Sequence, residues 1–103
     1  MAYHHRIIAD NATVALNGTS LEFDVKGHEW LEVIGTCTTG TGTMTLQLSS
    51  DKSTWYDSSN VIVTTAGSDH HGLFNVVFPW ARFKYNQIMT GLYIEIATYS
   101  AVA

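Results

Sequence analysis

The sequence predicts an all-β protein: an antiparallel, jelly-roll-like β-sandwich of roughly seven to nine short strands. Several segments alternate apolar and polar residues with a period of two, which is typical of strands with one buried face. Clusters of Gly, Asn, Asp and Ser separate these segments at regular intervals, as turns would. The helical period is almost absent, and β-branched and aromatic residues occur throughout the 103 residues.

The N-terminal part of the chain contributes the first expected strands. Residues 4–8, HHRII, and residues 12–17, ATVALN, are two candidates, and residues 1–10 are interpreted as an N-terminal arm or an edge strand. The segment SLEFDVK at residues 20–26 alternates cleanly. Its apolar residues should therefore face the core: Leu21, Phe23 and Val25.

Two further strands are expected between residues 29 and 49. The first half of EWLEVIGTCT, residues 29–38, is apolar on both faces, which predicts a central strand covered on both sides. The segment TMTLQLS, residues 43–49, alternates again. Its apolar residues should lie in the core: Met44, Leu46 and Leu48.

A turn is expected from Ser49 to Ser53, where the Asp51 side chain would cap backbone groups. Trp55 follows this turn and is predicted to pack beneath it, closing the edge of the sandwich. Tyr56 points the opposite way on an extended chain, so it is the better candidate to reach a partner.

The C-terminal half supplies four more candidate strands: NVIVTT at 60–65, GLFNVVF at 72–78, ARFKYNQI at 81–88 and GLYIEIATY at 91–99. Alternation places one set of residues toward the core: Phe74, Val76, Phe78, Leu92, Ile94 and Ile96. It places a second set outward: Tyr93, Glu95 and Tyr99. No linker or charge run divides the chain, so residues 1–103 are predicted to form one domain.

Charge composition and hydropathy argue against two classes of partner. Only 14% of the residues are charged, against about 25% in typical soluble domains, and the net charge is −4. The five Lys and Arg residues are scattered rather than clustered, so we expect no binding to nucleic acid. No apolar run approaches the ~20 residues that span a bilayer, so we expect no membrane partner.

The chain lacks a G-x-S-x-G elbow, an H-E-x-x-H segment and a phosphate-binding glycine loop. We therefore expect no enzyme activity, no cofactor and no metal. Cys37 is the only cysteine, which excludes an internal disulfide. The pairs His4-His5 and His70-His71 leave one alternative open. Because neighbouring residues on a strand point to opposite faces, a metal site would require the two pairs to converge.

The aromatic residues are the remaining candidates for function, as contacts with a partner. Five are assigned to a candidate interaction surface: Tyr3, Tyr56, Trp80, Tyr93 and Tyr99. Aromatic side chains are favoured in protein interfaces, which is the main interpretation. They also stack on sugar rings, so carbohydrate binding by Trp55, Tyr56 or Trp80 is the alternative.

The stretch from residue 20 to residue 99 resembles a known group of proteins. It contains a Thr/Gly-rich hairpin, the segment LQLSSDKSTW, a strand ending in aromatic-Pro, and the stretch PWARFKY before the final strand GLYIEIATY. This combination is similar to the small β-sandwich proteins of tailed-phage virions: head decoration or cement proteins, head fibres and tail-associated domains. That family often has Asp-Gly in the turn that here spans Ser49 to Ser53. The pair Asp51-Lys52 found here disfavours a tight turn that needs a positive φ.

The resemblance implies a non-enzymatic structural protein, made in the host cytoplasm and placed on the capsid exterior. It implies a decoration or cement role, with the major capsid protein or another virion protein as the partner. It also implies a homo-oligomer, with a trimer favoured over a dimer. A carbohydrate-binding module on the tail or the capsid exterior is the alternative.

Overall fold

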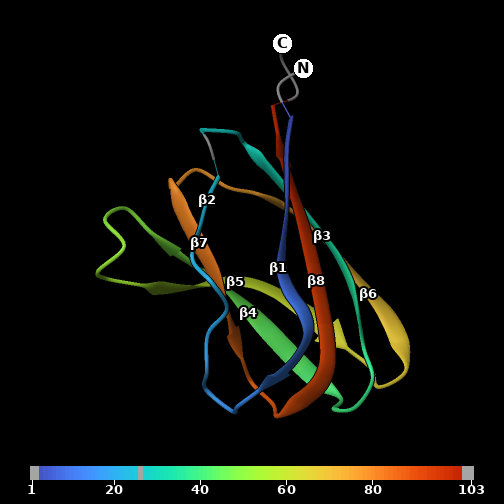
Figure 1. The fold of residues 1–103 in the computed structure, drawn as a ribbon. Coiled ribbons are helices and arrows are strands. Elements are labelled where there is room, and N and C mark those ends of the chain that lie inside the picture. Colours follow the sequence, from blue (N-terminus) through green and yellow to red (C-terminus); the bar gives the residue numbers. More distant parts are fainter. Residues whose placement is uncertain (1–2, 26, 101–103) are drawn as a thin grey trace.

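The computed structural model describes residues 3–25 and 27–100, and these residues form eight strands and no helix (Figure 1). The described chain thus holds no helix that could cross a membrane. All the long pairings are antiparallel, which confirms the predicted all-β sandwich. The strands are β1 (Tyr3–Val14), β2 (Phe23–Asp24), β3 (Trp30–Cys37), β4 (Gly42–Ser49), β5 (Tyr56–Thr64), β6 (Ser68–Asn75), β7 (Trp80–Tyr85) and β8 (Met89–Tyr99).

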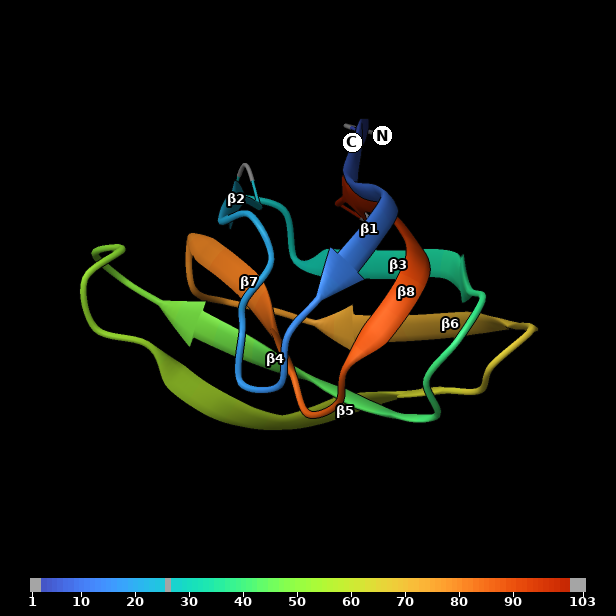
Figure 2. The same cartoon turned by 60° about the horizontal axis from the view of Figure 1, so that its bottom comes forward.

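The strands form two four-stranded sheets with the orders β1-β8-β3-β6 and β2-β7-β4-β5 (Figure 2). The first strand therefore pairs with the eighth, the second with the seventh, the third with the sixth and the fourth with the fifth. This is the connectivity of a jelly roll, in which a long antiparallel hairpin is rolled into two facing sheets. It confirms the predicted architecture.

The core lies between the two sheets, where alternate residues of each strand point inward. Phe23 of β2 and Phe83 of β7 pack with their ring centroids 6.1 Å apart. Full burial of an apolar side chain of this size stabilises the fold by roughly 1.5–3 kcal/mol. The largest fully buried apolar side chains are Phe23, Phe83, Leu31, Met44, Leu46, Ile62, Met89, Leu92 and Ile94.

Most of the predicted core residues are buried, but two predictions are wrong. Leu21 is 58% exposed and Phe78 is 48% exposed. Leu21 precedes β2, which has only two residues, and Phe78 follows β6, which ends at Asn75. The period of two continues in the sequence beyond the ends of these strands, where it no longer indicates which side chains face the core. Leu48 and Phe74 are partly buried against the core.

The prediction that residues 29–38 are covered on both sides is also wrong. Strand β3 is central by hydrogen bonding, because it pairs with both β8 and β6. Only one of its faces is covered, however, and Ile34 on the other face is 47% exposed. The apolar residues on its second face therefore form part of the surface.

Strand boundaries differ from the predicted ones at both ends of the chain. Residues 4–8 and the start of 12–17 belong to one long strand, β1, which lies at the edge of its sheet. Of the alternatives considered for residues 1–10, the described part, from residue 3 onward, is therefore an edge strand. The strand expected at residues 72–78 begins earlier than predicted, at Ser68, and ends at Asn75.

Candidate interaction surfaces

The outer face of the sheet β1-β8-β3-β6, here called the open face, carries its side chains in ordered rows. Residues directly opposite each other on neighbouring strands point to the same side of the sheet. Two adjacent rows cross all four strands: His5, Ala97, Glu32 and Leu73 in one, and Ile7, Glu95, Ile34 and His71 in the other.

Two histidine–carboxylate pairs link neighbouring strands on the open face. His5 of β1 contacts the Glu95 carboxylate of β8, and His71 Nε2 of β6 lies 2.9 Å from Glu32 Oε2 of β3. The Tyr93 hydroxyl donates to Glu95 Oε1 at 2.7 Å. The hydrogen bond from Tyr93, and then the one from His5, lowers the pKa of Glu95. Because these groups are accessible to water, the pairs add little to the stability of the fold. Their main effect is to fix the side chains in position.

Apolar side chains stand exposed among these pairs. Ile7 and Ile34 are each 47% exposed, and Leu73 is 48% exposed. A shallow hollow beside Ile34 is lined by Thr36, Tyr93 and the edge of β6. Apolar side chains exposed on one face of a sheet are available for contact with a partner.

His70 lies beneath the open face, on the inner side of β6. Its side chain is buried, and neither ring nitrogen has a hydrogen-bond partner within the described chain. It lies opposite Gly35 of β3, where an added Cβ would come within 2.5 Å of His70 Nε2 and 1.9 Å of Tyr93 O. Burial lowers the pKa of His70, although the nearby Asp69 carboxylate opposes the change. The ring is therefore neutral at neutral pH.

The histidine pairs do not converge. His4 and His5 lie on β1 and His70 and His71 on β6, which are the two opposite edges of one sheet. Residues 3–25 and 27–100 contain no group of three His, Cys, Asp or Glu side chains that could hold a metal ion. The alternative of a shared metal site is thereby contradicted.

Two cation–π contacts hold the β4–β5 hairpin against the outer face of the sheet β2-β7-β4-β5. The Arg82 guanidinium lies 4.3 Å from the centre of the Trp55 ring, and Lys52 Nζ lies 4.5 Å from that of Trp80. Glu22 lies 3.8 Å from both cations. Such cation–π contacts are worth roughly 0.5–1 kcal/mol each at exposed sites. Trp55 thus packs against Arg82 of β7 rather than standing free, as predicted, but it lies over an inner strand of the sheet and does not close the edge of the sandwich.

The turn of this hairpin corrects one prediction. Lys52 has a φ of 67°, although no glycine is present. Asp51 Oδ1 accepts hydrogen bonds from the Ser53 and Thr54 backbone N–H groups at 2.8 and 3.0 Å. Ser49 Oγ accepts one from the Lys52 N–H at 2.9 Å. These bonds hold the backbone in the left-handed region that a lysine seldom adopts.

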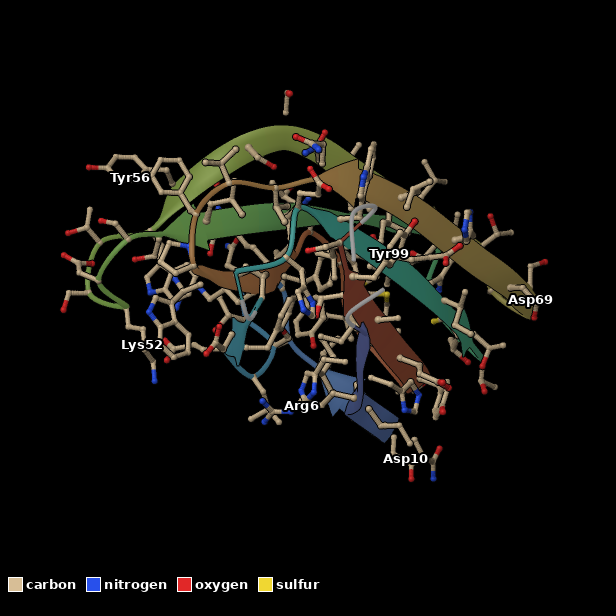
Figure 3. The ribbon with its side chains drawn as sticks, turned by 90° about the horizontal axis from the view of Figure 1, so that it is seen from above. Arg6, Asp10, Lys52, Tyr56, Asp69 and Tyr99 are labelled. Carbon is tan, nitrogen blue, oxygen red and sulfur yellow. The ribbon has the colours of Figure 1, made fainter. Side chains whose placement is uncertain are left out.

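Tyr56 contributes to a separate hollow at the end of the hairpin. Tyr56 is 67% exposed. Figure 3 shows its side chain at the hairpin end of the molecule. The hollow is lined by Leu48, Ser49, Ser50, Tyr56, Asp57, Ser58 and Phe78. Asp57 Oδ1 is fixed by a hydrogen bond from Gln47 Nε2 at 2.7 Å, and Gln47 in turn accepts from Arg82 Nε at 2.8 Å.

The five aromatic candidates therefore do not form one surface. Tyr93 and Tyr99 lie on the open face, and the backbone of Tyr3 is paired with Tyr99. Tyr56 belongs to the hollow at the hairpin, far from Tyr99 (Figure 3). Trp80 lies under Lys52 on the other sheet.

The exposed apolar residues of the open face, Ile7, Ile34 and Leu73, were not predicted from the sequence. One signal was present: the first half of residues 29–38 is apolar on both faces. That signal was interpreted as burial, whereas a strand with a second apolar face can equally present it to a partner.

Comparison with known proteins gives one solved structure with this fold. The chain is similar to the crystal structure of the SPBc2 prophage-derived protein YomS, with a TM-score of 0.63 and 11% sequence identity over 95% of each chain. At this identity the likeness shows a shared fold. No protein-family model matches the sequence, and no curated protein matches it.

Proposed function

We propose that this protein is a non-enzymatic structural component of a phage particle, which decorates the head by binding the major capsid protein lattice through its open face. The observation that carries the proposal is the group of exposed apolar side chains on that face, Ile7, Ile34 and Leu73. Burial of such side chains on a partner supplies the main favourable term in association.

Two further features support the proposal. The fold is shared with a prophage-derived protein, which supports a phage origin. The jelly roll itself occurs in viral capsid domains, and its sheets offer rigid faces suited to repetitive assembly. The His–Glu pairs around Ile34 fix the positions of charged groups, which favours one orientation of the partner over others.

A binding experiment with matched variants tests the proposal. Purified protein is mixed with undecorated heads of the phage whose genome carries this gene, and the bound fraction is measured by sedimentation. Ile34→Asp should lower the affinity at least about tenfold, which corresponds to 1.4 kcal/mol. Val63→Asp is the control, because Val63 is 65% exposed on β5 of the other sheet and should not affect binding. Equal binding by both variants would contradict the proposed surface.

The hollow at Tyr56 supports a second candidate function, the binding of a carbohydrate. An exposed aromatic ring stands there beside a fixed carboxylate and serine hydroxyls, the groups that contact sugar rings and their hydroxyls. Purified protein would be screened on a glycan array, with Tyr56→Ala as the comparison. The absence of binding at millimolar sugar would remove this candidate.

A further inference from the structure

Three of the four edge strands carry features that discourage pairing with another chain. Strand β2 has only two residues. Strand β1 has register shifts from Ile7 onward and a charged residue, Arg6, in its regular part. The pairing of β5 with β4 is interrupted by a shift between Thr45 and Gln47. Short edges, charges and bulges are the means by which sheet proteins protect their edges.

Strand β6 has neither a short ladder nor a register shift, and its one charged residue, Asp69, lies next to its first residue. All eight of its residues, Ser68–Asn75, pair with β3 without a register shift. The strand contains no Lys, Arg or Pro, and it lies at the end of the strand order β1-β8-β3-β6. In Figure 1 it is the outermost strand on its side of the molecule. An uninterrupted edge of this kind is a template for a further strand.

The register of the β3–β6 ladder identifies which backbone groups of β6 point away from β3. The Val76 N–H donates to Glu29 O at 2.8 Å, which makes this pair a hydrogen-bonded position of the antiparallel ladder. Such positions alternate along a ladder. The residues of β6 that bond to β3 are therefore the even-numbered ones. The odd-numbered residues direct their N–H and C=O groups away from β3: Asp69, His71, Leu73 and Asn75.

We propose that two copies of this chain pair through β6, antiparallel and about a twofold axis at Gly72, to form a continuous eight-stranded sheet. A strand paired with its own copy is self-complementary by symmetry, which favours a second copy as the occupant of this edge. The register centred on Gly72 brings all four outward-directed residues into hydrogen-bonded positions. It forms about eight backbone hydrogen bonds between the subunits, two for each of four pairs.

The side chains are compatible with this register. Asp69 lies opposite the partner's Asn75, and His71 lies opposite the partner's Leu73, so no like charges face each other. The side chain of His71 remains 58% exposed while it pairs with Glu32. The open face becomes continuous across the two subunits. The result is a dimer, whereas the resemblance to virion proteins favoured a trimer over a dimer. The proposed pairing does not depend on the proposed capsid role.

The oligomeric mass in solution tests this pairing. Sedimentation equilibrium over a concentration series should show a mass that doubles reversibly between the micromolar and millimolar ranges. Leu73→Pro removes an N–H that points away from β3, so it should abolish the dimer and retain the fold. Leu73→Ala keeps that N–H and should retain the dimer. A monomer at millimolar concentration, or a dimer that persists in folded Leu73→Pro, would overturn the proposal.

Hydrogen exchange of the wild-type protein gives a test that needs no variant. The amides of the outward-directed residues should exchange more slowly as the concentration rises: Asp69, His71, Leu73 and Asn75. The amides of His70 and Gly72 already bond to β3 and should change less. If the outward amides exchange at the same rate in dilute and concentrated samples, the pairing through β6 is wrong, even if the protein dimerises by another surface.

Discussion

The neutral, unpaired ring of His70 predicts that the protein loses stability in mild acid. The residue is 4% exposed, and neither ring nitrogen has a hydrogen-bond partner among residues 3–25 and 27–100. Burial lowers its pKa in the folded state, whereas the unfolded chain protonates near the ordinary value of 6.5. Above pH 6.5 both states are neutral, so His70 contributes no pH dependence there. Below pH 6.5 the unfolded state binds the proton more readily, and stability falls.

The size of this effect has an upper bound. Each pH unit below 6.5 removes at most about 1.4 kcal/mol, so the loss between pH 6.5 and pH 5 is at most about 2 kcal/mol. Replacing His70 by Leu removes the titrating group. Because the ring makes no hydrogen bond, the replacement leaves no partner unsatisfied and should stabilise the fold at pH 7 by about 1 kcal/mol.

Urea unfolding followed by tryptophan fluorescence at pH 8, 7, 6 and 5 measures this effect. The difference in unfolding free energy between wild type and His70→Leu should grow as the pH falls below 6.5. His71→Gln is the control, because His71 is exposed on the same strand and its replacement should leave the pH dependence of wild type largely intact. A difference between wild type and His70→Leu that is constant from pH 8 to pH 5 would refute the reasoning.

Three further substitutions test the packing. Gly35→Ala should destabilise the fold by about 3 kcal/mol, since the new Cβ meets Tyr93 O and the His70 ring, and a Tm near that of wild type would contradict this. Phe83→Ala should cost about 3–5 kcal/mol in chemical unfolding, because it removes a fully buried ring that packs on Phe23. Arg82→Ala should shift the tryptophan emission to the red, because it uncovers the Trp55 ring, and should lower Tm modestly, because Gln47 Oε1 loses its donor; an unshifted spectrum would show that the cation does not cover the ring.

The longer strands were predictable because each is long enough for its period of two to be visible. In β8, Leu92, Ile94 and Ile96 alternate with Tyr93 and Glu95, and one face of the strand is buried as that pattern requires. The same rule failed at Leu21 and Phe78, since local alternation does not reveal where hydrogen bonding to a neighbouring strand ends.

The candidate surfaces were less predictable, because they depend on which strands become neighbours. The pairing of His71 with Glu32 joins residues 39 positions apart, and that of His5 with Glu95 joins residues 90 positions apart. Only the strand order β1-β8-β3-β6 brings these groups onto one face. The five aromatic candidates were likewise grouped by type, whereas the topology distributes them over separate surfaces.

The measurement that most directly tests the central claim is a cryo-electron microscopy reconstruction of heads incubated with the purified protein. Density for the jelly roll is expected on the head exterior, with the face bearing Ile34, Glu32 and Glu95 against the major capsid protein. Heads that remain bare, or density in which the hollow at Tyr56 or the sheet β2-β7-β4-β5 contacts the lattice, would contradict it.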